Sequence, residues 1–248
     1  MRIIISPAKK MKSEEEYLKW SNLPCYLSET EKLLSYLKSL KYEELKNIWK
    51  CNDKIAQLNY ERLQYMDLKN NLVPAILSYD GIQYQYIASQ VMEDSQLEYI
   101  EEHLRILSGF YGILKPFDGV VPYRLEMQSK LCDFEVNTLY EYWDNKIFSI
   151  LKEETDSILN LASKEYSKCI EKYLCDDIKF VTCIFGELID GKVKEKGTFA
   201  KMARGEMVRY LSEIKANKIE EAKSFSRLGY SYSDELSSDT KYVFVKGE

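Results

Sequence analysis

The sequence contains very few of the residues from which a metal site or a disulfide scaffold is built. Its 248 residues include a single histidine, His103, and six cysteines, none of which form a Cys-x-x-Cys pair. A transition-metal site therefore has almost no imidazole or thiolate ligands, and only a carboxylate-only magnesium site is left open. We interpret the cysteines as small buried hydrophobic residues of a reduced compartment. We expect no metal ion and no cofactor.

Long apolar segments are missing as well. No stretch of eighteen consecutive apolar residues occurs, which argues against a membrane-spanning helix, and the run Ile3–Ile5 is too short for a signal peptide. We therefore expect a cytoplasmic protein without a membrane partner. The net charge of −5 argues against a uniformly basic surface, so nucleic-acid binding would need a local basic patch. Nothing in the sequence indicates an oligomeric state.

Turn and capping signals divide the chain into short helices and strands, and no Pro-rich or Ser-rich linker separates them. Strand patterns occur at 2–5, 75–79, 157–161, 178–188, 228–232 and 242–245, with an alternating run at 84–86 and a hairpin at Asp190-Gly191. Helical patterns cover 28–68 with short connections, 95–107, 139–151 and 199–215. Since strands and helices do not alternate regularly, we predict one mixed α+β domain spanning residues 1–248.

The segment 103–127 concentrates the residues that interrupt regular structure. It contains three of the ten glycines, two of the five prolines and the only histidine. The pattern Leu-Ser-Gly-Phe-Tyr-Gly at 107–112 predicts a tight turn with buried aromatic residues, in the manner of a helix-hairpin-helix. Glycines in such a turn would let backbone N–H groups approach phosphate oxygens, and the nearby Arg105, Lys115 and Arg124 would add electrostatic attraction.

A second group of candidates lies where two predicted strands end. Ser6 follows the strand 2–5, and strand ends in open α/β sheets commonly carry binding residues, although a solvated basic loop around Lys9 is the equal alternative. Asn160 and Ser163 stand at a strand-to-helix junction, where they could bind an anion or simply cap the helix. Two carboxylates next to cations, Glu126 and Glu165, are candidates for acid–base chemistry.

Several short blocks occur in a fixed order along the chain around this central segment. They are Ile5-Ser-Pro-Ala-Lys9, Asn52-Asp-Lys-Ile-Ala56, Leu139-Tyr-Glu-Tyr-Trp143, Asn160-Leu-Ala-Ser163, Ala203-Arg-Gly205 with Arg209, and Gly229-Tyr-Ser-Tyr232. Together with HLRILSGFYGILKPFDGVVPYRLEM at 103–127, they resemble the YaaA family of bacterial peroxide-stress proteins. The resemblance covers essentially the whole chain.

The resemblance implies protection against hydrogen peroxide through limiting free iron and its damage to DNA. It also implies a DNA-binding protein with an unusual single-domain α+β fold, in which a helix-hairpin-helix lies beside a basic cleft. Carried over by position, the hairpin contains Ser108, Gly109, Tyr111 and Gly112, and the cleft cations are Lys9, Arg105, Lys115, Arg124, Lys164, Lys201, Arg204 and Arg209. Because the chain lacks ligands for storing iron, its effect on iron is expected to be indirect.

Two functions follow as hypotheses. The first is non-enzymatic, largely sequence-independent binding of duplex DNA through the hairpin backbone and the cleft cations. The second is an enzyme that acts on a nucleotide or another phosphorylated small molecule in the same cleft, with a pocket formed by Ser6, Glu126, Asn160, Ser163 and Glu165. The chain has neither a P-loop motif nor a Ser-His-Asp order, so no catalytic residue is assigned and the first hypothesis is preferred.

Overall fold

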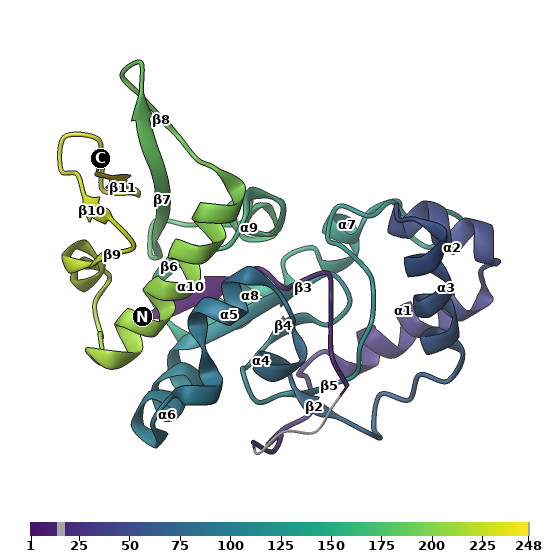
Figure 1. The fold of residues 1–248 in the computed structure, drawn as a ribbon. Helices are drawn as coiled ribbons and strands as arrows, with labels where there is room; N and C mark the ends of the chain where they lie inside the picture. The colour runs from purple at the N-terminus through teal and green to yellow at the C-terminus, as the bar shows by residue number, and fades with distance from the viewer. Residues whose placement is uncertain (14–17, 248) are drawn as a thin grey trace.

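The computed structural model describes residues 1–13 and 18–247, and it has a mostly parallel sheet at its centre (Figure 1). The strand order is β4-β3-β1-β6-β7-β11-β10-β9, and β8 pairs with β7. The bounds are β1 (Arg2–Ile5), β3 (Leu104–Ser108), β4 (Gly112–Leu114), β6 (Ser157–Leu161), β7 (Lys179–Ile189), β8 (Lys192–Lys194), β9 (Ser226–Arg227), β10 (Tyr230–Tyr232) and β11 (Lys241–Lys246). The pairs β1–β3, β1–β6, β6–β7 and β7–β11 are parallel. A separate antiparallel pair joins β2 (Val73–Pro74) to β5 (Gly119–Val120).

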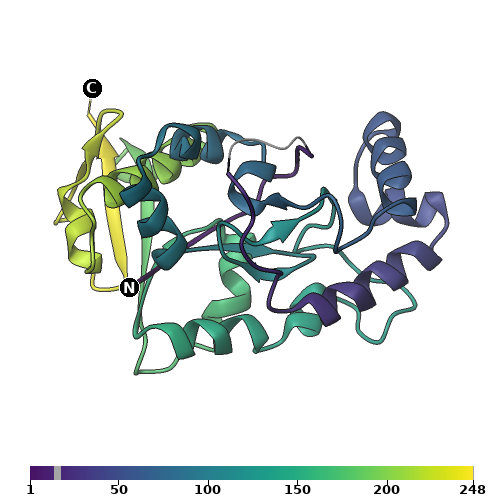
Figure 2. The same ribbon diagram turned by 90° about the horizontal axis from the view of Figure 1, so that it is seen from below.

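Helices cover both faces of this sheet (Figure 2). One face carries α5 (Ile82–Ile87), α6 (Asp94–His103) and α10 (Gly197–Glu213), and the other carries α8 (Lys146–Glu154) and α9 (Lys164–Glu171). The central strand β1 is therefore shielded on both sides, and its residues Ile3, Ile4 and Ile5 are fully buried. A continuous β-branched run without polar alternation is what such a position requires.

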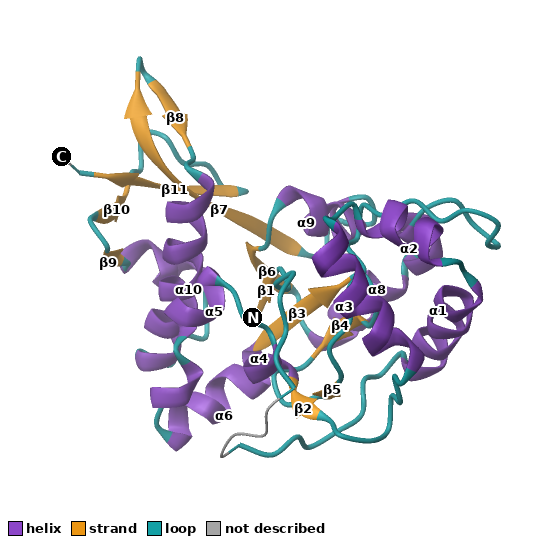
Figure 3. Cartoon of the chain, turned by 45° about the vertical axis from the view of Figure 1, so that its right-hand side comes forward, coloured by secondary structure: helices purple, strands orange, loops and turns teal. Residues whose placement is uncertain are grey.

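The remaining helices extend the molecule beyond the strand β4 (Figure 3). They include α1 (Leu27–Ser39), α2 (Tyr42–Trp49) and α3 (Asp53–Gln64), which form a group at the end of the molecule opposite β9 and β10. Short elements connect the rest: α4 (Ala75–Ser78), α7 (Leu139–Trp143) and the 3-10 turns η1 (Ser89–Val91) and η2 (Ile219–Ser224). No helix in the described part of the chain has the length and apolarity needed to cross a bilayer.

The predicted mixed α+β architecture is confirmed, and so are the strands at both ends of the chain and the turn at Asp190-Gly191. Three of the local predictions were wrong. The segment 75–79 contains the helix α4 and the run 84–86 lies in α5, because a short apolar segment that is buried all round does not distinguish strand from helix. The helix expected at 139–151 is two helices, since the backbone of Asp144, with φ of 43° and ψ of −126°, is not helical.

The expected helix-hairpin-helix at the central segment is also wrong. Helix α6 ends at His103, and the chain continues directly as β3, turns, and returns antiparallel as β4. Every residue from Leu104 to Leu114 is buried. The apolar spacing at 97, 100, 104 and 107 fits a helix, but pairing of 104–106 with β1 decides the conformation, because tertiary contacts override local propensity.

The two glycines of this turn serve packing. A Cβ on Gly109 would lie 2.5 Å from the carbonyl oxygen of Leu125, and Gly112, with φ of +75°, lies against the ring of Trp143. The amides of Phe110 and Tyr111 donate to Ser108 Oγ at 3.2 and 2.9 Å. These two amides are therefore buried and already hydrogen-bonded, so they are not available to bind a phosphate.

Candidate functional site

A pocket of about 400 Å³ opens at the carboxyl ends of β1 and β6, and we call it the edge pocket. The chain leaves β1 for β3 on one side and leaves β6 for β7 on the other, so the two connections diverge here. Such a point in a parallel sheet creates a crevice in which ligands commonly bind. The two strand-end serines meet in it: the amide of Ser163 donates to Ser6 Oγ at 2.8 Å, and Ser6 Oγ donates to Ser163 Oγ at 3.2 Å.

Residues from five parts of the chain line the edge pocket. They are 6–10, 80–84 and 123–126, together with Ser163, Glu165, Tyr166, Lys201 and Arg204. Five of these side chains are cationic (Lys9, Lys10, Arg124, Lys201 and Arg204) and three are carboxylates (Asp80, Glu126 and Glu165). The pocket thus carries two positive charges in excess on a chain with a net charge of −5. It is a local basic patch of the kind that an acidic protein would need to bind an anion.

The carboxylates hold several of these cations in place. Glu126 accepts from Lys9 Nζ at 2.7 Å through one oxygen and from Arg124 Nη2 at 2.9 Å through the other. Arg204 Nη2 donates to Glu195 Oε1 at 3.2 Å. An ion pair with Lys10 lowers the pKa of Asp80. Glu165 differs: burial raises its pKa, and the nearby Glu126 raises it further against the opposing effects of the Gln128 amide and Lys9.

Three buried N–H groups of the edge pocket have no acceptor. They are Gln83 Nε2, Arg124 Nε and Arg204 Nε, and only one other buried side-chain nitrogen or oxygen in the described ranges is in this position, Trp49 Nε1. Leaving a buried donor unpaired costs about 1–3 kcal/mol, so such groups are rare and call for an explanation. Their concentration in one pocket is typical of a site prepared for a ligand that accepts hydrogen bonds.

Close packing of α10 on α5 brings together the helices that carry two of these groups. A Cβ on Gly205 would lie 2.2 Å from the carbonyl oxygen of Gln83 and 2.8 Å from Tyr86 Cβ. Only glycine permits this approach, which sets Arg204 beside Gln83. Tyr123, which also lines the pocket, is neutral: burial raises its pKa to about 12, and its hydroxyl lies 2.7 Å from Ser108 Oγ.

The structure divides the residues that the sequence suggested. Eight of them line the edge pocket: Ser6, Lys9, Arg124, Glu126, Ser163, Glu165, Lys201 and Arg204. Asn160 and Lys164 line an adjoining hollow that shares Arg204. Arg209 lies farther along α10 and pairs with Glu213 at 3.1 Å.

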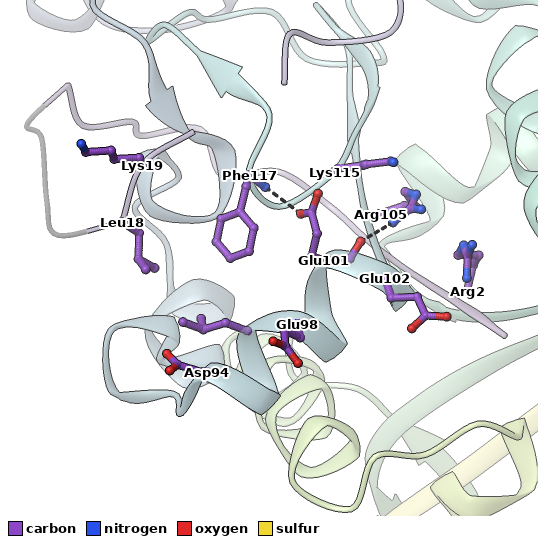
Figure 4. A pocket seen from close by; sticks show the side chains of 11 residues that line it. Arg2, Leu18, Lys19, Asp94, Glu98, Glu101, Glu102, Arg105, Lys115 and Phe117 are labelled. Carbon is purple, nitrogen blue, oxygen red and sulfur yellow. Dashed lines mark hydrogen bonds between the residues drawn. The ribbon is translucent and has the colours of Figure 1, made fainter. Parts of the chain in front are cut away.

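The other candidates are elsewhere. Ser108, Gly109, Tyr111 and Gly112 are buried in the β3–β4 turn. Arg105 and Lys115 line a separate hollow near the start of β3 (Figure 4). There Arg105 is buried and donates to both oxygens of Glu154, from Nε at 2.8 Å and Nη2 at 3.0 Å. Its charge is committed to a structural ion pair.

Sequence reasoning missed Asp80, Gln83, Tyr84 and Tyr123. The one local signal, Asp80-Gly81, indicates only a turn after the run 75–79, and in the structure it leads directly into the short helix α5. No motif marks Gln83, whose importance depends on α10 and on the strand end at Ser6.

A helix–turn–helix pair does border the edge pocket, at a different place from the one expected. Helices α2 and α3 are joined by the turn 50–52, in which Lys50 has φ of 44° and the side chain of Asn52 caps α3 by accepting from the amide of Ile55 at 3.0 Å. Arg124 Nη2 donates to the carbonyl of Trp49 at 3.5 Å, which ties the end of α2 to the pocket.

Comparison with known proteins shows the family of the chain. The family model of the peroxide stress protein YaaA matches residues 1–236. This chain belongs to the YaaA family. It is 60% identical over 248 residues to a UPF0246 protein of Lachnoclostridium phytofermentans, covering 100% of the chain and 97% of the relative. UPF0246 proteins of Desulfitobacterium hafniense (58% identical, covering 99% and 98%) and Pediococcus pentosaceus (54% identical, covering 100% and 99%) are similar along their whole lengths.

Proposed function

We propose that this YaaA-family peroxide stress protein binds duplex DNA, largely independently of sequence, with the edge pocket and its rim contacting phosphates. The observation that supports this proposal is the excess of cations in one concave site of an otherwise acidic chain. Phosphate contacts alone supply most non-specific affinity for DNA. DNA covered in this way offers fewer phosphates to free iron, which gives an indirect route to protection under peroxide stress.

The cations at the rim are suited to exchange their partners. The side chains of Lys9 and Lys10 are 62% and 77% exposed, although each pairs with a carboxylate. Exposed ion pairs contribute only about 0–1 kcal/mol, so a phosphate can replace the carboxylate at little cost. The β3–β4 turn is buried, whereas the turn between α2 and α3 is exposed. In this proposal the α2–α3 turn, and not the β3–β4 turn, approaches the DNA backbone.

Fluorescence anisotropy with a labelled duplex of about 30 base pairs tests this proposal over a range of salt concentrations. We expect the logarithm of affinity to fall linearly with that of salt. Lys9→Glu and Lys201→Glu should each weaken binding about tenfold for all sequences alike, because a phosphate contact becomes a repulsion. Lys152→Glu makes the same charge change at an exposed site on α8, outside the pocket, and should have little effect. Binding that ignores salt, or that weakens equally in all three variants, would show the proposal to be wrong.

A second candidate is an enzyme that acts on a nucleotide or another phosphorylated small molecule in the same pocket. The observation in its favour is Glu165, a half-buried carboxyl group with a raised pKa beside pocket cations, since perturbed groups of this kind cluster at catalytic sites. Screening the purified chain for turnover of nucleotides tests it. Turnover that disappears in Glu165→Gln would support an enzyme, and absence of turnover across the screen would argue for binding alone.

A further inference from the structure

We propose that the inner part of the edge pocket, at Gln83, Arg124 and Arg204, is a subsite for a terminal phosphate group, that is, a phosphate monoester. The group would be carried by the end of a DNA strand or by a free nucleotide. This inference rests on the proposed function, since it specifies which part of a phosphate-bearing ligand enters the pocket.

The chemistry of the unpaired groups selects an acceptor. Gln83 Nε2, Arg124 Nε and Arg204 Nε are all donors, and the Gln83 residue is only 7% exposed. In both guanidinium groups the carboxylate partner is bound by a different nitrogen, Nη2, which leaves Nε for a ligand. The three donors belong to residues of α5, α10 and the 123–126 segment that line one pocket, and they equal in number the three terminal oxygens of a monoester.

The charge of the site matches the same group. The edge pocket has two positive charges in excess. A phosphate monoester carries about −1.5 to −2 at neutral pH, whereas a backbone diester or a carboxylate carries one negative charge. A monoester is therefore the phosphate form that neutralises the pocket.

The shape of the site favours a phosphate that is linked to the rest of the ligand on one side only. The pocket is backed by Tyr84, Tyr123 and Tyr166, all buried, and Tyr84 Oη is engaged with the carbonyl of Ser6 at 2.9 Å. A diester inside a strand continues in two directions and so cannot end against such a wall. The volume of about 400 Å³ suits one nucleotide rather than the width of a duplex.

The test compares ligands that differ only in the terminal phosphate. Affinities of the full chain are measured for one blunt duplex with 5′-phosphate or 5′-hydroxyl ends, and for dAMP against deoxyadenosine. We expect the phosphate to strengthen binding at least about tenfold in one or both pairs. An effect of the strand end identifies DNA as its source, and an effect confined to dAMP identifies a free nucleotide.

Gln83→Met provides the variant, because methionine keeps the length of the side chain and removes the donor. We expect it to reduce the ratio of affinities for phosphorylated and unphosphorylated ligands to near one without lowering the melting temperature of the free chain. Gln90→Met, at an exposed position of η1 outside the pocket lining, is the matched control and should keep the ratio. Arg204→Lys, which retains charge but loses the Nε–H, should reduce the ratio as well.

Two outcomes separate this inference from DNA binding itself. Salt-dependent duplex binding with equal affinity for both kinds of end, and no binding of dAMP, would overturn the subsite and leave DNA binding intact. Binding of dAMP that is lost in Gln83→Met, without duplex binding at any salt concentration, would support the subsite and overturn DNA binding.

Discussion

Asp118 shows how one buried carboxyl group can set a pH dependence of stability. It is 4% exposed and accepts from the amide of Lys115 at 2.8 Å, which holds the turn between β4 and β5. Burial raises its pKa to about 7, with Glu101 adding to the rise while the Lys115 amide, Lys115 and Arg105 oppose it. An unfolded chain releases this proton near pH 4. The folded state therefore keeps this proton up to a higher pH than the unfolded chain does. The free energy of unfolding consequently falls as the pH rises from about 4 to 7.

Asp118→Asn removes this titration and keeps an acceptor for the Lys115 amide. At pH 8 we expect the variant to exceed the parent chain in free energy of unfolding by about 2–4 kcal/mol, and at pH 4.5 by much less, because the parent carboxyl is then largely neutral. Urea unfolding followed by circular dichroism at both pH values measures the difference. Asp190→Asn, at a side chain that is 89% exposed, is the control. An equal gain at both pH values would contradict this account.

Gly205 decides how closely two helices approach. Since a Cβ would lie 2.2 Å from backbone of α5, Gly205→Ala must push α10 away from Gln83. We expect a loss of about 1–3 kcal/mol in the free energy of unfolding, as overpacking usually costs. Gly197 begins the same helix in open space, so Gly197→Ala should leave stability unchanged or raise it by up to about 1 kcal/mol. Chemical denaturation of the two variants compares them, and equal stabilities would show that the contact is not limiting.

The elements that could be predicted from the sequence are those with a purely local cause. The β-branched run of β1 and the turn at Asp190-Gly191 required no knowledge of the rest of the chain. The strand β3 could not be predicted, because its apolar spacing continues that of α6 and only the parallel partner β1 makes it a strand. The glycines of the β3–β4 turn were attributed to a ligand for a similar reason. A glycine pattern does not reveal whether a phosphate or Trp143 occupies the space beside it.

The part of the candidate site that could be predicted consists of residues at strand ends, where binding residues commonly lie. Ser6 and Ser163 were found in this way. Their contact could not be predicted, because it requires β1 and β6 to be neighbours in the sheet, and no local pattern indicates this pairing. Gln83 was out of reach for sequence reasoning, because its unpaired amide arises from the packing of α10 on α5. Family resemblance supplied the cations and could not separate those of the edge pocket from Arg105, which belongs to a buried ion pair.

At the scale of the whole molecule, we expect DNA binding to depend more on where the charges lie than on the net charge. The edge pocket lies at the carboxyl ends of the central strands, whereas the exposed Asp176 and Asp177 lie at their amino ends, beside Ser157 and Lys179. The five-residue strand β6 separates the two edges by about 13 Å or more. Charges of one edge act on the other only where salt does not screen them, and the screening length is about 8 Å at 0.15 M and about 30 Å at 0.01 M.

The double variant Asp176→Asn with Asp177→Asn therefore tests whether DNA binding responds to the local patch or to the net charge. At 0.15 M salt we expect its affinity for duplex DNA to stay within about twofold of the parent chain, and at 0.01 M to rise severalfold, because the acidic edge then repels the DNA. Lys201→Gln, a change of one unit inside the edge pocket, should weaken binding at both salt concentrations. Anisotropy titrations of the three proteins decide the matter. If the double variant gained as much affinity at 0.15 M as at 0.01 M, the net charge and not the edge pocket would control association.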